Sequence, residues 1–308
     1  MLVKPRREFP ALLLKVRGTA LAQIWPLLVV AGLVSWGLSW LHERFELHWI
    51  ELTLAPFTLV GLALSIFLGF RNSACYERWW EGRKLWGRLV NTSRSYARQV
   101  LTLVRSDDPA AAALHRELVD RHAAYVHALR LHLREQRTWE ELAPFLPAGE
   151  LDALRTQRNV PYALTCRQAE RHREAMDRGW LDPFHLPVLE AALTDLLDIQ
   201  GGCERIKNTP VPLAYTELTH RIVALYVLCL PFGVIDTVGA LTPVVVVMVA
   251  FCFLGLDAVG SQIENPFEED PNDLPLSQLS RMIENDVRQR VGHAELRPDV
   301  QPERGILL

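Results

Sequence analysis

Long uncharged apolar runs lie in two parts of the chain, and a region dense in charged residues separates them. The first part holds the runs 20–41 and 52–70, joined by the short polar loop 42–51. A helix that crosses roughly 30 Å of hydrocarbon needs about 20 mostly apolar residues, because its backbone polar groups must be hydrogen bonded within the segment. The two runs therefore predict two membrane-spanning helices in a hairpin.

A second hairpin is predicted between residues 213 and 260. Apolar runs cover 222–235 and 237–256, and only Asp236 lies between them. The first of these runs is short for a membrane crossing, so we extend its helix backward through 213–221 and place the charged residues there at its aqueous end. The sequence thus predicts four transmembrane helices in two hairpins.

The charged region between the hairpins is also predicted to be helical. No residue from 71 to 105 breaks a helix, so the second membrane helix is expected to continue to about residue 104. No stretch alternates between apolar and polar positions as a strand would, which makes the chain an all-α integral membrane protein. Prolines suited to a first helical turn help to place further helices over 109–136, 147–156, 161–178 and 185–207.

The predicted organisation has five consecutive segments. They are a cytosolic N-terminal segment 1–19, a first transmembrane hairpin 20–70, a cytosolic helical region 71–212, a second transmembrane hairpin 213–260 and a cytosolic C-terminal segment 261–308. The orientation follows from basic residues, because Lys and Arg accumulate in the cytoplasmic flanks of membrane helices. Both the N-terminal segment and the stretch after residue 70 are rich in Arg and Lys. Both termini are therefore expected in the cytoplasm.

Composition and motifs exclude several functional classes. The formal net charge of −3 gives no basic field for nucleic acid. The five cysteines form no Cys-x-x-Cys pair, so neither a zinc site nor a disulfide framework is indicated. The chain also lacks a Gly-rich phosphate loop, an HExxH motif and a Gly-x-Ser-x-Gly elbow, and we do not expect an enzyme.

Three histidines in the charged region recur at a spacing of five, namely His122, His127 and His132. Residues at that spacing do not share one helix face, so they make a poor metal site. We interpret them as part of a solvated or intersubunit surface that is rich in His and Arg.

Leu62, Ile66 and Phe70 form an apolar stripe on the second predicted helix. Their spacing of four residues, at about 1.5 Å per residue, gives a stripe roughly 12 Å long. Periodicity alone leaves three interpretations open, which are a lipid-facing surface, a packed core and the lining of a pore.

Three motifs resemble the bestrophin family and its bacterial homologues. Residues 65–73 (SIFLGFRNS), followed by YERWW at 76–80, resemble the signature of the second helix. Residues 201–216, which contain GGCERIKNTPVP, resemble the bacterial branch, and NPFEEDPNDLPL at 265–276 resembles the segment after the last membrane helix. The similarity is collinear from about residue 5 to residue 285.

The resemblance implies a homopentamer in a bacterial inner membrane with one central ion pore. Leu62, Ile66 and Phe70 match the apolar neck of the family, so five copies would stack three hydrophobic rings. The family also has a lower cytosolic aperture near the start of the helix that leads to the GGCER motif. Phe184 is the candidate by position, and Leu186 is close enough to replace it.

The resemblance also implies a calcium site, and we expect no other cofactor. Gln262, Asn265, Asp270 and Asp273 fall where animal bestrophins bind calcium, and oxygen atoms are the ligands that this cation prefers. Here the acidic run of the family is interrupted at residues 271–272, which are Pro and Asn. The alternative is a loop of solvated acids that caps the last membrane helix.

The apolar rings do not determine the sign of the conducted ion. Similarity to the bacterial branch predicts monovalent cations, sodium or potassium, with chloride as the alternative. Asp257 and Glu264 would either form negative rings or pair with Arg71 or Arg78, and we expect the pairing. A secondary transporter and a non-conducting membrane sensor are the competing functions.

Overall fold

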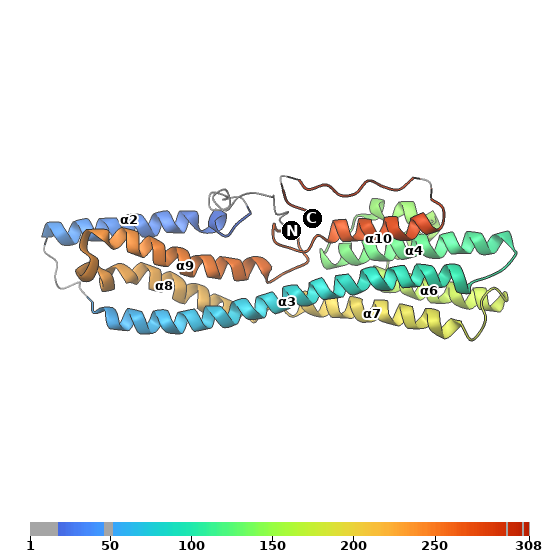
Figure 1. Ribbon diagram of the computed structural model, residues 1–308, viewed down its shortest axis with the longest axis horizontal. Helices are drawn as coiled ribbons and strands as arrows, with labels where there is room; N and C mark the ends of the chain where they lie inside the picture. The colour runs from blue at the N-terminus through green and yellow to red at the C-terminus, as the bar shows by residue number, and fades with distance from the viewer. Residues whose placement is uncertain (1–17, 46–51, 294, 304, 308) are drawn as a thin grey trace. The chain divides into compact units, whose positions relative to one another are not determined.

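A computed structural model of the protein describes residues 18–45, 52–293, 295–303 and 305–307 (Figure 1). Loop residues 46–51 and most of the basic N-terminal segment lie outside the described residues. The described part is helical, with isolated β-bridges but no strand, which confirms the predicted all-α class. It divides into two compact units. Of the described residues, the membrane unit contains 18–45, 52–79 and 210–265, and the aqueous unit contains 80–209 and those from 266 onward.

The membrane unit contains α2 (Leu21–Phe45), α8 (Leu213–Val238), α9 (Thr242–Ile263) and the first part of the long helix α3 (Leu54–Leu103). The helices α2, α8 and α9 lie side by side in Figure 1 and pack against one another. The extension of the third apolar run back to residue 213 is confirmed, because α8 begins there. Their shared core is apolar and contains Ile24, Ala31, Leu64, Leu68, Val223, Val227, Leu230, Val234, Val246, Ala250, Leu254 and Ala258.

Three helical stretches of the described chain are long and apolar enough to cross a membrane. They are Leu21–Phe45, Leu54–Leu103 and Leu213–Ile263. The third stretch is divided by the short 3₁₀ helix η4 (Gly239–Leu241) into α8 and α9, which contact each other. Gly239 has a φ of 54°, a conformation that glycine adopts without steric cost. Four crossings in two hairpins remain the prediction for this arrangement.

Helix α3 (Leu54–Leu103) is continuous over 50 residues, which confirms the predicted extension beyond the membrane segment. In the membrane unit, close approach to α8 depends on glycines in both helices. A Cβ on Gly61 would lie 2.7 Å from the Tyr226 hydroxyl, and a Cβ on Gly233 would lie 2.2 Å from the ring of Phe57. Small residues at such contacts allow membrane helices to pack closely.

The aqueous unit contains the second part of α3 together with α4 (Pro109–Leu133), α5 (Ala148–Leu154), α6 (Val160–Asp177) and α7 (Leu186–Asn208). Two short 3₁₀ helices, η2 (Trp139–Glu141) and η3 (Ala143–Phe145), lie between α4 and α5. Asp108 caps α4 by accepting the Ala110 N–H at 2.8 Å. The end of α4 was predicted three residues too late, because Glu135 has a φ of 56° and turns the chain out of the helix.

Helix α10 (Leu276–Arg290) was not predicted within the C-terminal segment. It lies beside α4 in Figure 1 and packs against it. Leu276, Leu279, Ile283 and Val287 are buried and recur at helical spacing. The sequence contains this amphipathic pattern, but most residues of the interval are polar, so a search for long apolar runs does not detect it.

The surface interpretation of the three histidines is wrong for two of them. His122 and His127 are 0% and 3% exposed, because α4 is covered by α6, α7 and α10 on different sides. A spacing of five points successive side chains in different directions, and here two of those directions lead into the interior. His132 is half-buried near the end of α4.

Candidate pore-lining site

The predicted neck residues share one exposed face of α3. Leu62, Ile66 and Phe70 are 62%, 53% and 69% exposed in the single chain. Leu64 and Leu68 point the other way and are almost completely buried in the core of the membrane unit. Large apolar side chains aligned on an exposed face require a cover, which is lipid, another copy of the chain or the confined space of a pore.

Arg71 fixes the rotation of this face, since it directly follows Phe70 and points into the membrane unit. Its side chain is fully buried and donates from Nη1 to Asp257 Oδ1 at 2.7 Å. Its Nη2 donates to Ser261 Oγ at 2.9 Å and to Glu264 Oε2 at 3.4 Å. The guanidinium therefore ties α3 to the last turns of α9, and the predicted pairing of Asp257 and Glu264 with arginine is confirmed.

Neighbouring polar contacts extend this connection to α8. His220 Nε2 lies 3.2 Å from Asp257 Oδ2, so one carboxylate joins three helices. Asn72 donates from Nδ2 to the Leu256 carbonyl at 3.0 Å, and Arg78 donates from Nε to the Glu264 carbonyl at 3.1 Å. Helix α3 thus has an exposed apolar face and, directly after it, a group of polar side chains that anchors the helix.

Phe184 and Leu186, the aperture candidates, lie at the start of α7 but differ in exposure. Phe184 is 89% exposed, the highest value among the large apolar side chains of the described residues. Its N–H donates to Asp182 Oδ1 at 2.8 Å, which fixes the turn before α7. Leu186 is the first residue of α7 and is half-buried. The structure therefore separates the two candidates by exposure, and the aperture itself remains a prediction.

The four calcium candidates are divided between the two units. Gln262 is buried near the end of α9 and Asn265 is exposed, both in the membrane unit, whereas Asp270 and Asp273 belong to the aqueous unit. Within the described chain, no three His, Cys, Asp or Glu side chains converge as a metal site would require.

Asp273 nevertheless fits a cation ligand. Its Oδ2 accepts the Asp270 N–H at 2.7 Å, and its buried Oδ1 has no hydrogen-bond partner in the described structure. Burial raises the pKa of Asp273 to about 7, and the negative charges of Asp270 and Glu268 add to this effect. A buried carboxylate oxygen without a partner is the kind of group that a bound cation would stabilise.

Comparisons with known proteins identify the family. The family model described as bacterial/fungal bestrophin protein matches residues 1–289. A voltage-dependent anion channel-forming protein of Ralstonia nicotianae is 40% identical over 300 residues, which cover 96% of each chain. The voltage-dependent anion channel-forming protein YneE of Escherichia coli strain K12 is 34% identical over 304 residues, with 99% of this chain and 98% of that protein covered.

A solved structure gives the same answer. The crystal structure of a point variant of a bacterial bestrophin homologue from Klebsiella pneumoniae matches with a TM-score of 0.83 and 31% identity. The match covers 88% of this chain and 100% of that one. These similarities support a membrane ion channel and not an enzyme, in agreement with the sequence. The chain belongs to the bestrophin family, within its bacterial and fungal group.

Proposed function

We propose that five copies of this chain enclose one central ion pore, with Leu62, Ile66 and Phe70 forming its hydrophobic neck. The observation that carries the proposal is the orientation of α3, whose apolar stripe is exposed while Arg71 anchors the helix in the membrane unit. The number of copies and the role of the stripe both follow the family resemblance. The bacterial inner membrane, with both termini in the cytoplasm, is the setting that the basic flanks favour.

The neck would gate by dewetting. Five copies would place three apolar rings along roughly 12 Å, since successive neck residues are four positions apart. A narrow apolar tube holds water poorly, and an ion must keep most of its hydration to pass, so a small change in radius produces a large change in conductance. Arg71 contributes rigidity here, because Asp257 and Glu264 already neutralise its charge.

For the conducted ion, we propose anions. The relatives from Ralstonia and Escherichia are named as anion channel-forming proteins. Asp257 and Glu264, the acids that would form negative rings, both pair with Arg71, which neutralises one of their two charges and so reduces the field that would attract a cation. Monovalent cations, expected from similarity to the bacterial branch of the family, are the second candidate. The neck itself is neutral and accommodates either sign.

Phe184 is proposed to line a second constriction on the cytosolic side. The Phe184 side chain is 89% exposed in one chain, so it is available for contacts with other copies. Five copies around an axis would bring five phenyl rings together. Such a ring would act on ions after the neck has admitted them.

Calcium is proposed as a ligand of the segment after α9, with Asp273 and Asp270 as carboxylate ligands and the side chains of Gln262 and Asn265 as amide oxygens. A bound calcium ion would supply positive charge that stabilises the buried Asp273 carboxylate. Isothermal titration of purified protein with calcium chloride tests this directly. Heat that disappears in Asp273→Asn supports the site, and the absence of heat in the natural protein supports the loop of solvated acids.

The function is tested by planar-bilayer recording of purified protein under an asymmetric salt gradient. A reversal potential near that of chloride supports the anion channel, and one near that of sodium supports the cation channel. Saturable flux that requires a gradient of a second ion would identify a transporter. Silence after verified insertion, together with liposomes that stay tight to small ions, would identify a non-conducting sensor.

A further inference from the structure

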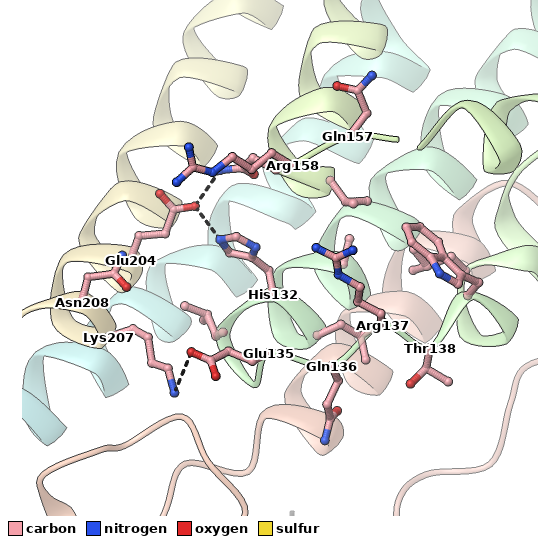
Figure 2. Close-up of a pocket in the computed structure, with 17 residues that line it drawn as sticks. His132, Glu135, Gln136, Arg137, Thr138, Gln157, Arg158, Glu204, Lys207 and Asn208 are labelled. Carbon is pink, nitrogen blue, oxygen red and sulfur yellow. Dashed lines mark hydrogen bonds and ion pairs between the residues drawn. The ribbon is translucent and has the colours of Figure 1, made fainter. Parts of the chain in front are cut away.

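A cavity in the aqueous unit is lined by none of the predicted neck or aperture residues. It has a volume of about 630 Å³ and is bounded by the end of α4, η2, the start of α6 and the end of α7 (Figure 2). Small-molecule sites commonly have volumes of about 300–1,000 Å³ and combine an apolar floor with a few polar groups. Buried Leu131, Leu133 and Leu142 supply such a floor, and Trp139 adds an aromatic wall.

The two acids of the cavity are already paired. Glu204 accepts hydrogen bonds at Oε1 from Asn159 Nδ2 at 3.0 Å and from Gln200 Nε2 at 2.7 Å. His132 Nε2 lies 3.2 Å from the same oxygen, and Figure 2 shows the His132 ring facing Glu204. The second acid, Glu135, has Lys207 Nζ at 3.9 Å.

Two arginines that line the cavity have no ion-pair partner within the described residues. Arg137 and Arg158 line it from separate segments, the loop after α4 and the loop before α6. Both are exposed, and within the described part of the chain neither forms an ion pair or a side-chain hydrogen bond. Figure 2 shows Arg137 and Arg158 among the residues that line the cavity. After internal pairing, the charge that remains available in the cavity is therefore positive.

The backbone places Arg137 over the cavity at a conformational cost. Glu135 is the one non-glycine residue of the described chain with a positive φ, at 56°. Its N–H donates to the His132 carbonyl at 3.2 Å, and the Gln136 N–H donates to the Leu131 carbonyl at 2.8 Å. These two bonds form a Schellman turn in which glycine is the usual residue at the left-handed position. The turn reverses the chain at the end of α4, so that the following residues line the cavity.

We propose that this cavity binds a small organic anion that carries at least two negatively charged oxygen groups, with Arg137 and Arg158 as its principal ligands. Guanidinium groups bind carboxylate and phosphate oxygens through paired hydrogen bonds, and two of them from separate loops suit an anion with more than one such group. The apolar floor and Trp139 accommodate the carbon framework. The site is independent of the proposed pore, so its binding can be measured without conductance.

Isothermal titration of the full-length protein in detergent tests the proposal, with citrate, ADP and pyrophosphate as probes. Citrate or ADP is expected to bind with a Kd below about 1 mM. Arg137→Ala and Arg158→Ala are each expected to weaken binding about tenfold, the usual effect of losing one charge-assisted hydrogen bond. The double variant is expected to lose measurable binding. Lysine at either position should recover only part of the affinity, because it lacks the forked geometry.

Arg116→Ala is the matched control. Arg116 is an exposed arginine of α4 that does not line the cavity, and its loss removes the same net charge. The control should bind the probes with unchanged affinity. Equal weakening in Arg116→Ala and the cavity variants would show attraction to general surface charge and overturn the site. Absence of binding by all three probes overturns it as well, as does a preference for pyrophosphate over both organic anions, since the apolar floor would then have no role.

Discussion

The two units of this chain differ in where their charged side chains lie. In the membrane unit, large apolar side chains face outward, and among its described residues Arg71 is the one charged side chain that is buried. In the aqueous unit, ionic groups penetrate the interior. Arg121 is 2% exposed and is held by Glu150, which accepts from its Nε at 2.7 Å and from its Nη2 at 2.6 Å.

A second buried pair shows the same contrast. His127 Nε2 lies 2.9 Å from Glu284 Oε2, and this pair joins α4 to α10. The pKa of His127 is lowered, mainly by burial, although the hydrogen bond with Glu284 opposes the shift. The comparison indicates that the stability of the membrane unit depends strongly on the one cluster around Arg71. The stability of the aqueous unit depends on several buried titratable groups.

The largest expected effect is the loss of the Arg71 cluster. Arg71→Ala leaves Asp257 and Glu264 without their guanidinium, and removal of one partner from a buried ion pair costs about 3–5 kcal/mol. We expect a strongly lowered Tm and loss of the assembled protein on size-exclusion chromatography. The control is Arg94→Ala in the aqueous unit, whose exposed ion pair with Asp286 should change stability by less than about 1 kcal/mol. Equal effects of the two variants would contradict the comparison.

The second effect concerns pH and the aqueous unit. Burial lowers the pKa of His122 to about 3, against an ordinary value of 6.5. The unfolded chain therefore binds a proton that the folded protein does not, and stability falls as the pH drops below 6.5 toward 3. Each pH unit in that window costs up to about 1.4 kcal/mol.

His122→Phe removes this group and should flatten the dependence of Tm on pH between 6.5 and 4.5. Part of the slope will remain, because burial also lowers the pKa of His127, which therefore binds a proton more readily in the unfolded chain over the same pH range. The exposed His185 supplies the control, since His185→Phe should leave the slope unchanged. An unchanged slope in His122→Phe would show that His122 does not carry the acid sensitivity.

The third effect is on conduction. Simultaneous substitution of Leu62, Ile66 and Phe70 by alanine should raise leak current in planar bilayers by roughly tenfold, which corresponds to about 1.4 kcal/mol off the barrier. Val60→Ala provides the control, since Val60 is also exposed but lies on a different face of α3. Conductance and gating that stay unchanged in the triple variant would exclude the neck.

The sequence predicted more of the membrane unit than of the aqueous unit, for a physical reason. Hydrophobicity over about 20 residues is a strong local signal, and it located α2, α8 and the start of α3 to within a few residues, whereas α9 begins five residues and ends seven residues after the predicted run 237–256. Family motifs then supplied the neck candidates, which spacing alone left ambiguous between lipid, core and pore.

The cavity between α4 and α7 was not predictable in the same way. It depends on a left-handed Glu135 at the end of α4 and on the pairing of Glu204 with residues distant in sequence. His122 and His127 were misassigned to the surface because burial of a polar residue depends on tertiary packing. Helix α10, in contrast, had an apolar period that a closer count would have detected.

The smallest expected effect concerns Phe184, the most exposed large apolar side chain of the described aqueous unit. Because this side chain has almost no packing to lose, Phe184→Thr should change the free energy of unfolding by no more than about 0.5 kcal/mol, the range typical of surface substitutions, and should leave Tm nearly unchanged. If five copies form the aperture, the same variant should nevertheless shift the reversal potential measured between chloride and larger anions.

Leu186→Thr distinguishes the two aperture candidates. Leu186 is half-buried and begins α7, so its substitution should lower Tm without altering ion selectivity. Selectivity that shifts in Leu186→Thr but not in Phe184→Thr would transfer the aperture to Leu186.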